Sequence, residues 1–197
     1  MTSTQKYLEQ AKEIFNSFEK WNAFLELYKI KDQLRGLWFQ ELEDAVCRKV
    51  NCIPDLKNKW SFRKDQINSY GWYINEHGED SLLVCFDYNQ FCIYIDGEEY
   101  DRVGIIEKYR KTKLFNLYFN DNEIITNSKY LAAKKNIINI NGISDYDSLA
   151  YYANKKSSEH HILVDKISQF FLDYLNDIEI YNIINEIGNE FKINKNL

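Results

Sequence analysis

The alternation of apolar residues in residues 81–101 limits the possible folds of this chain more than any other feature of its sequence. With Tyr88 and Asn89 as the central residues of a hairpin turn, three apolar pairs share one face of the ribbon: Phe86 with Phe91, Val84 with Ile93, and Leu82 with Ile95. A slip of one residue would move each apolar side chain to the opposite face. The segment therefore predicts an antiparallel hairpin with one buried face.

Helical periodicity flanks this segment on both sides. Apolar residues recur every three or four positions over residues 4–28, 33–50, 144–152, 158–175 and 177–191. The first of these stripes consists of Tyr7, Ala11, Ile14, Phe15, Phe18, Trp21, Leu25 and Tyr28. The second helix should end before Pro54, because the residue preceding a proline is disfavoured in the helical region. Ser144 and Asp177 are the expected capping positions of two C-terminal helices.

The order of these patterns predicts one α+β domain over residues 1–197. It is helical at 1–55, sheet-rich at 56–142 and helical at 143–197. A largely antiparallel sheet at about 60–126 would be covered by the N-terminal and C-terminal helices. The hydrophobic share of 45% supplies enough material for such a core.

Shorter elements are predicted inside the sheet-rich region. Alternation predicts strands over residues 70–74, 115–119 and 137–140, and periodicity predicts short helices over 103–110 and 128–135. Asp96-Gly97 is a strong hairpin signal, because a type I′ turn needs positive φ at both of its central residues. A strand over residues 98–102 is expected to follow that turn.

Composition and charge indicate a soluble cytoplasmic protein with no membrane partner. No apolar run is long enough to cross a bilayer, and the N-terminus lacks the apolar core of a signal peptide. The bias toward Asn, Ile, Lys and Tyr is typical of AT-rich coding sequence, as in some bacteria and mobile elements. Cys85 and Cys92 face each other in the predicted hairpin, and a reducing compartment predicts that they stay thiols rather than form a disulfide.

No catalytic residue and no cofactor is predicted, because the usual nucleophile, phosphate-loop and metal motifs are missing. The three histidines, His77, His160 and His161, are poorly spaced for chelating an ion. In an alternative hypothesis, Mg²⁺ is bound by the carboxylates of Asp87, Glu98, Glu99 and Asp101. A charged hairpin edge, which keeps the sheet from aggregating, is the simpler explanation of these acids.

Charge is unevenly distributed along the chain. The formal net charge is −5, yet residues 108–156 carry nine basic and four acidic residues. Basic residues interleaved with aromatic ones are typical of nucleic-acid-binding surfaces. The candidates for phosphate contacts are Lys108, Arg110, Lys111, Lys113, Lys134 and Lys135. An ordinary solvated lysine surface explains the same residues.

The acidic remainder of the chain favours a protein partner. A negative surface attracts basic proteins, and exposed Tyr or Trp side chains serve as anchors in interfaces. All four tryptophans lie within the first 72 residues: Trp21, Trp38, Trp60 and Trp72. We expect a non-catalytic protein-binding module of the inhibitor, immunity or defence type, with an acidic aromatic surface. The alternative is a nucleic-acid-binding protein or a divergent Mg²⁺-dependent nuclease that uses the basic middle segment.

Overall fold

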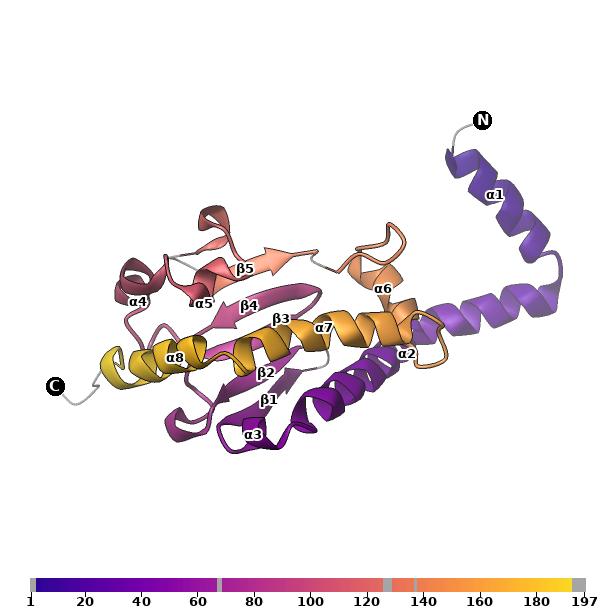
Figure 1. Ribbon diagram of the computed structural model, residues 1–197. Helices are drawn as coiled ribbons and strands as arrows, with labels where there is room; N and C mark the ends of the chain where they lie inside the picture. The colour runs from indigo at the N-terminus through magenta and orange to yellow at the C-terminus, as the bar shows by residue number, and fades with distance from the viewer. Residues whose placement is uncertain (1–2, 67–68, 126–128, 137, 193–197) are drawn as a thin grey trace. The chain divides into compact units, whose positions relative to one another are not determined.

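The computed structural model describes residues 3–66, 69–125, 129–136 and 138–192, and it confirms the predicted α+β class. Along the chain, helices come first and last, and the strands of an antiparallel sheet come between them in sequence (Figure 1). The chain forms two compact units, residues 1–37 and residues 38–197. We call them the N-terminal unit and the sheet unit, and we describe each by itself.

At the C-terminal end of the chain the helix bounds follow the sequence patterns closely, although Asp145 rather than Ser144 caps the helix at Tyr146–Ala153 by accepting from the Ser148 amide. The longer helices are α1 (Ser3–Ile14), α2 (Phe18–Asn51), α4 (Arg102–Tyr109), α6 (Tyr146–Ala153), α7 (His160–Leu175) and α8 (Ile178–Glu190). The short helical turns are α3 (Pro54–Lys57), η1 (Asn75–His77), α5 (Lys113–Asn116) and η2 (Asp121–Glu123). The strands are β1 (Trp60–Gln66), β2 (Ser69–Ile74), β3 (Leu83–Asp87), β4 (Gln90–Tyr94) and β5 (Tyr130–Lys135).

The five strands form one antiparallel sheet in the order β1-β2-β3-β4-β5. The predicted register of the central hairpin is confirmed, with Phe86 opposite Phe91 and Val84 opposite Ile93. The two turn residues, Tyr88 and Asn89, have φ angles of 48° and 61°. Positive φ at both positions is what a two-residue type I′ turn requires.

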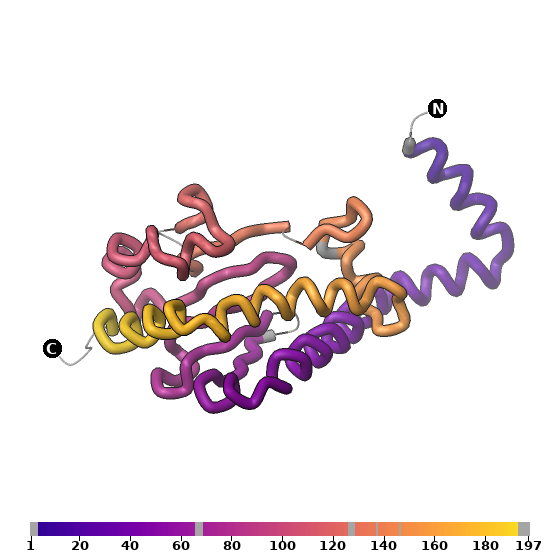
Figure 2. The backbone as a smooth tube through the Cα atoms, in the orientation of Figure 1, coloured from indigo at the N-terminus to yellow at the C-terminus, as the bar shows by residue number. Residues whose placement is uncertain are grey.

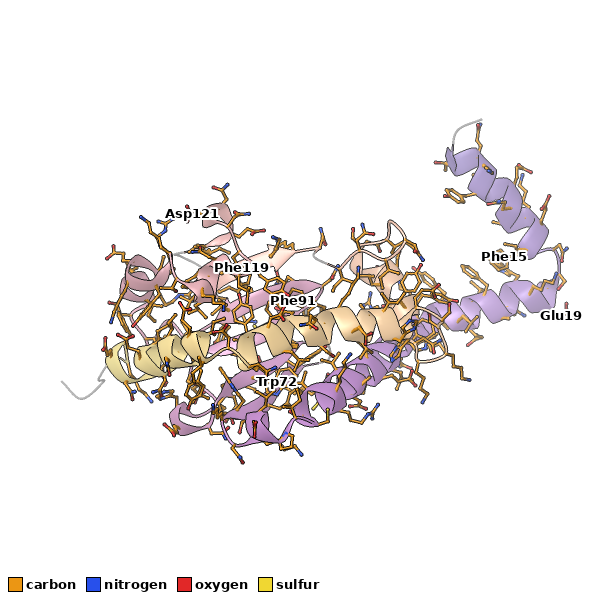
Figure 3. The ribbon with its side chains drawn as sticks, in the orientation of Figure 1. Phe15, Glu19, Trp72, Phe91, Phe119 and Asp121 are labelled. Atoms are coloured by element: carbon orange, nitrogen blue, oxygen red, sulfur yellow. The ribbon has the colours of Figure 1, made fainter. Side chains whose placement is uncertain are left out.

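Helices cover the apolar face of this sheet. Figure 1 shows α7 across the sheet, and Figure 2 shows α8 continuing in nearly the same line. The ring of Trp72 lies 4.4 Å from that of Phe171, and Phe91 stacks on Phe170 with a centroid separation of 3.8 Å. Figure 3 shows Trp72 and Phe91 on the side of the sheet that faces α7. Burial of large aromatic side chains against one helix therefore holds this layer on the sheet.

The opposite face of the sheet carries a smaller buried cluster of Leu83, Cys85 and Cys92. Tyr73, Tyr94 and Tyr130 pack around it. Cys85 lies opposite Cys92 as predicted, and both residues are free thiols. Burial raises the pKa of Cys92 well above its ordinary value, so this thiol is protonated and poorly reactive.

The first helix break lies at a different place from the prediction. The predicted helix over residues 4–28 is interrupted after Ile14, and the expected break near residues 29–32 is absent because α2 runs through it. The Ser17 hydroxyl accepts a hydrogen bond from the Lys20 amide at 3.3 Å and so caps the start of α2. Residues 29–32 contain neither glycine nor proline, so nothing in their sequence ends a helix.

The predicted turn at Asp96-Gly97 and the strand after it are wrong. The positive-φ glycines among the described residues are Gly78 and Gly142, and Gly97 is not one of them. Instead the amide of Tyr100 donates to the Asp96 carbonyl at 3.1 Å, and Asp101 caps α4 by accepting from the Gly104 amide. Within residues 98–102, Tyr100 forms an isolated bridge to Lys192. The capping carboxylate therefore starts a helix where a hairpin was expected.

Three further predictions in this region fail. Residues 113–116 form helix α5 rather than a strand, and residues 130–135 form strand β5 rather than a helix. Strand β5 pairs with the otherwise free edge of β4, so sheet hydrogen bonds override a weak local helical preference. In the predicted strand at residues 137–140, Ile140 pairs with Ile143 in an isolated bridge, whereas Ile137 and Ser128 lie outside the described residues.

A buried ion pair attaches the end of α2 to the sheet. Glu43 is 3% exposed, and one of its carboxylate oxygens lies 2.8 Å from Lys64 Nζ. Burial raises the pKa of Glu43 above its ordinary 4.5, although Lys64 acts in the opposite direction. The folded state therefore binds this proton more tightly than the unfolded state does. The resulting stabilisation is complete below pH 4.5 and is lost as the pH rises through the folded-state pKa.

Replacing Glu43 by Gln should remove this pH dependence. We expect the free energy of unfolding of Glu43→Gln to rise relative to that of the wild type as the pH rises from about 4 to about 7. Urea unfolding at several pH values measures the difference. Glu41→Gln is the matched control, because hydrogen bonds from Lys155 lower the pKa of Glu41. Its difference from wild type should change in the opposite direction, and equal slopes for the two variants would contradict the prediction.

Candidate protein-binding surface

The N-terminal unit exposes an unusual concentration of large apolar side chains. Of the 17 exposed large hydrophobic residues in the described structure, 11 lie between Tyr7 and Leu37. They are Tyr7, Leu8, Ile14, Phe18, Trp21, Phe24, Leu25, Leu27, Tyr28, Ile30 and Leu37. Single exposed apolar residues are normal, whereas larger exposed apolar patches are typical of interaction sites.

Aromatic rings meet at the bend between α1 and α2. The Phe15 centroid lies 5.9 Å from that of Trp21 and 4.7 Å from that of Phe24, and Figure 3 shows Phe15 at this bend. Phe24 also lies 6.2 Å from Tyr28 on the next turn of α2. The same region holds an open apolar groove of about 550 Å³, lined by Ile14, Phe15, Lys20, Ala23, Phe24 and Leu27. A groove of this size accepts a protein side chain or a small ligand.

Charges on the N-terminal unit are balanced. Residues 1–37 contain six basic and five acidic residues. Several of them pair within their own helix, with Nζ of Lys12 2.9 Å from Glu9 and Nζ of Lys29 2.7 Å from Glu26. Exposed aromatic residues are therefore concentrated in the N-terminal unit, whereas the acidic excess lies in residues 38–197.

Exposure differs sharply among the four tryptophans. Trp21 is 45% exposed, whereas Trp60 and Trp72 belong to the buried core and Trp38 packs against its rim. The indole nitrogen of Trp60 donates to the Leu175 carbonyl, and that of Trp72 donates to the Asn51 side chain, each at 3.1 Å. An exposed indole is uncommon because burying it is favourable. Trp21 is thus the tryptophan that is available to a partner.

Most of the predicted nucleic-acid-binding residues are paired with carboxylates. Lys108 Nζ lies 2.6 Å from Glu186 and 2.8 Å from Glu190, Arg110 lies 3.3 Å from Asp121, and Lys134 lies 3.6 Å from Glu123. Lys113 pairs with Asp177. Among the described residues, Lys111 and Lys135 form no ion pair with a carboxylate. These acidic neighbours reduce the positive potential that phosphate binding requires.

The four candidate Mg²⁺ ligands are not brought together. Asp87 ends β3 beside the hairpin turn, whereas Glu98, Glu99 and Asp101 follow the opposite end of β4. A five-residue strand separates the two places by roughly 15 Å. Within residues 3–66, 69–125, 129–136 and 138–192, no group of three or more His, Cys, Asp or Glu side chains has metal-binding geometry.

Sequence reasoning missed the polar neighbours of Asp87. The Tyr130 hydroxyl donates to Asp87 Oδ2, and Lys129 Nζ lies 3.9 Å from the same oxygen. Burial, followed by the bond to Asp87, raises the pKa of Tyr130. The enclosed space beside these residues is about 10 Å³, which is room for about one water molecule and not for a substrate. The pairing of β4 with β5 creates this cluster, and the sequence predicted a helix at β5.

His77, which the sequence places in a turn, has a structural role. Its Nε2 lies 2.8 Å from the Asn185 side-chain oxygen, and its ring packs against Gly188 of α8. A side chain at position 188 would meet the imidazole at 2.5 Å. The contact joins η1 to α8.

Comparison with protein-family models, curated proteins and solved structures finds no match for this chain. None of the helices in the described residues has the length and apolar character needed to cross a bilayer.

Proposed function

We propose that this chain is a non-catalytic protein-binding module, of the kind that inhibitors, immunity proteins and defence systems use. The N-terminal unit carries its binding surface. The observation that supports this most is the exposed apolar surface of that unit, with Trp21 and Tyr28 among its aromatic residues. Trp and Tyr are over-represented among the residues that dominate binding energy in interfaces.

Charge on the sheet unit supports a basic partner. Residues 38–197 contain 25 of the 30 acidic residues and 19 of the 25 basic ones. A net negative unit attracts a basic protein over a range of about 10 Å at moderate salt and so raises its rate of association. The apolar surface would then supply the affinity, while the acidic residues supply the attraction.

A double substitution on the N-terminal unit tests this proposal. Trp21→Glu with Tyr28→Glu should weaken binding of a captured and purified partner by at least about thirtyfold, because loss of such anchors costs about 2 kcal/mol or more. Isothermal calorimetry with the purified partner measures the affinity. The matched control is Tyr151→Glu, which changes an exposed aromatic residue of the sheet unit. Equal affinity of the double variant and wild type would place the binding surface elsewhere.

The nucleic-acid alternative makes a different prediction. If residues 108–135 bound phosphates, retention on single-stranded DNA would fall steeply with salt, with a slope set by the number of phosphates contacted. Because four of the six candidate side chains lie beside carboxylates, we expect little retention even at about 0.05 M salt. Strong, salt-sensitive retention, or cleavage of DNA or RNA with Mg²⁺, would favour the alternative.

A further inference from the structure

We propose that a second copy of this chain covers the exposed stripe on α2 when no other partner is bound. The stripe consists of Phe18, Trp21, Leu25 and Tyr28. The two α2 helices would run antiparallel across a two-fold axis. This inference rests on the proposed function, because it takes the N-terminal unit to be a protein-binding surface, and it names the occupant of that surface.

The spacing of the stripe is self-complementary. Its residues are separated by three, four and three positions, which is the spacing of the buried seam in coiled coils. Reversing the direction of the helix leaves this spacing unchanged. A two-fold axis at the level of Ala23 therefore places Phe18 opposite Tyr28 of the second copy, and Trp21 opposite Leu25. Symmetric dimers use such a surface, in which one patch meets its own copy.

Exposure along the stripe shows that the seam is open. Phe18 is 74% exposed, Trp21 45%, Leu25 36% and Tyr28 61%. Asp32 and Arg35 continue the same spacing and pair with each other at 3.2 Å, so the apolar stripe ends at Tyr28. A stripe of this kind usually faces a core. Here the described residues of the N-terminal unit leave it in contact with solvent.

The stripe exposes enough area for a weak dimer. If each aromatic ring can bury about 200 Å², the exposed fractions of the four stripe residues leave roughly 400 Å² uncovered. A stable interface buries about 800 Å² on each partner. The stripe alone supplies about half of that area, so we expect a dimer that dissociates on dilution.

Charge on the N-terminal unit is compatible with a second copy. With six basic and five acidic residues, the unit has almost no net charge. Two copies of it can therefore meet without the cost of bringing like charges together. The acidic sheet units of two copies repel each other, so added salt should strengthen the dimer slightly.

The mass of the protein in solution tests whether a second copy covers the stripe. Light scattering after gel filtration should give twice 23.6 kDa at about 200 µM and a smaller average mass near about 1 µM. Trp21→Glu with Leu25→Glu should be monomeric throughout, whereas Tyr151→Glu should dimerise as wild type does. Trp21→Ala with Leu25→Ala keeps a strong helix former at both positions, and its dimer should be at least about thirtyfold weaker. Circular dichroism checks that each variant keeps its helices.

The antiparallel arrangement needs its own measurement. Spin labels at Gln33→Cys, with Cys47 and Cys52 replaced by Ser, should lie about 30 Å apart across the antiparallel dimer, because twenty residues of helix separate the two positions along the axis. A parallel pair would bring them to about 10 Å, and that result would overturn the arrangement. A wild-type chain that is monomeric at about 200 µM would overturn the second copy as occupant. A monomer that still binds a different protein through Trp21 would overturn the dimer and leave the proposed function standing. A dimer that binds no other protein would support the dimer and overturn the proposed function.

Discussion

Trp72→Ala is expected to lower the free energy of unfolding by about 3–5 kcal/mol, the range for removing a fully buried large aromatic side chain. Trp72 is 1% exposed and lies at the centre of the apolar face of the sheet. Its ring contacts Phe171 of α7 and Phe62 of β1, with centroid separations of 4.4 and 5.1 Å. Its loss leaves a cavity between the sheet and α7 and leaves the Asn51 side chain without its indole donor.

Urea unfolding followed by circular dichroism measures this effect. Trp21→Ala is the matched control, because it removes the same side chain from a site that is 45% exposed. We expect the control to change the free energy of unfolding by less than about 0.5 kcal/mol at a concentration where the chain is monomeric. Similar losses for the two variants would show that the core does not lie between the sheet and α7.

Gly71→Ala is expected to cost about 1–3 kcal/mol or more, through overpacking rather than through a cavity. Gly71 lies in the middle of β2, between Arg63 of β1 and Cys85 of β3. A methyl group there would lie 2.3 Å from the Val84 carbonyl oxygen and 2.9 Å from the Cys85 Cα. Both of these are backbone atoms of a paired strand, so the methyl group can be accommodated only if β2 and β3 move apart.

A second glycine separates this clash from the general effect of removing glycine. Gly78 has φ of +79° and nothing within 4 Å of an added methyl group. Gly78→Ala should therefore cost about 1 kcal/mol from backbone conformation alone. Thermal unfolding of both variants gives the comparison. If Gly71→Ala were no less stable than Gly78→Ala, the close approach of β2 to β3 would be disproved.

Local sequence patterns predicted the parts of the fold that depend on nearby residues. The turn at Tyr88 and Asn89 and its register follow from alternation within about ten residues, and the cap of α8 at Asp177 follows from its own first turn. The carboxylate of Asp177 accepts from the amides of Glu179 and Ile180, at 2.9 and 3.1 Å. In these places short-range hydrogen bonds and burial point to the same structure.

Long-range contacts explain what the sequence could not predict. β5 is a strand because it meets the edge of β4, although its own residues also suit a helix. The sequence predicted Lys108 as a phosphate ligand, but Glu186 of α8, almost eighty positions later in the chain, lies beside it. Trp21 was one of four candidate anchors, and the fold alone separates it from the buried Trp60 and Trp72. Pairing across the chain, rather than local preference, decides each of these cases.

The order of the strands has a consequence for how the chain folds. The first four strands are neighbours in both sequence and space, so each pairing closes only a short loop, and the entropy lost at each step is small. The fifth strand joins only after the 35 residues that separate it from the fourth have been brought round. We therefore expect the first four strands to form quickly as the folding nucleus and the fifth strand to attach more slowly. Until it attaches, the edge of β4 is exposed and is the surface most open to mispairing while the chain emerges from the ribosome.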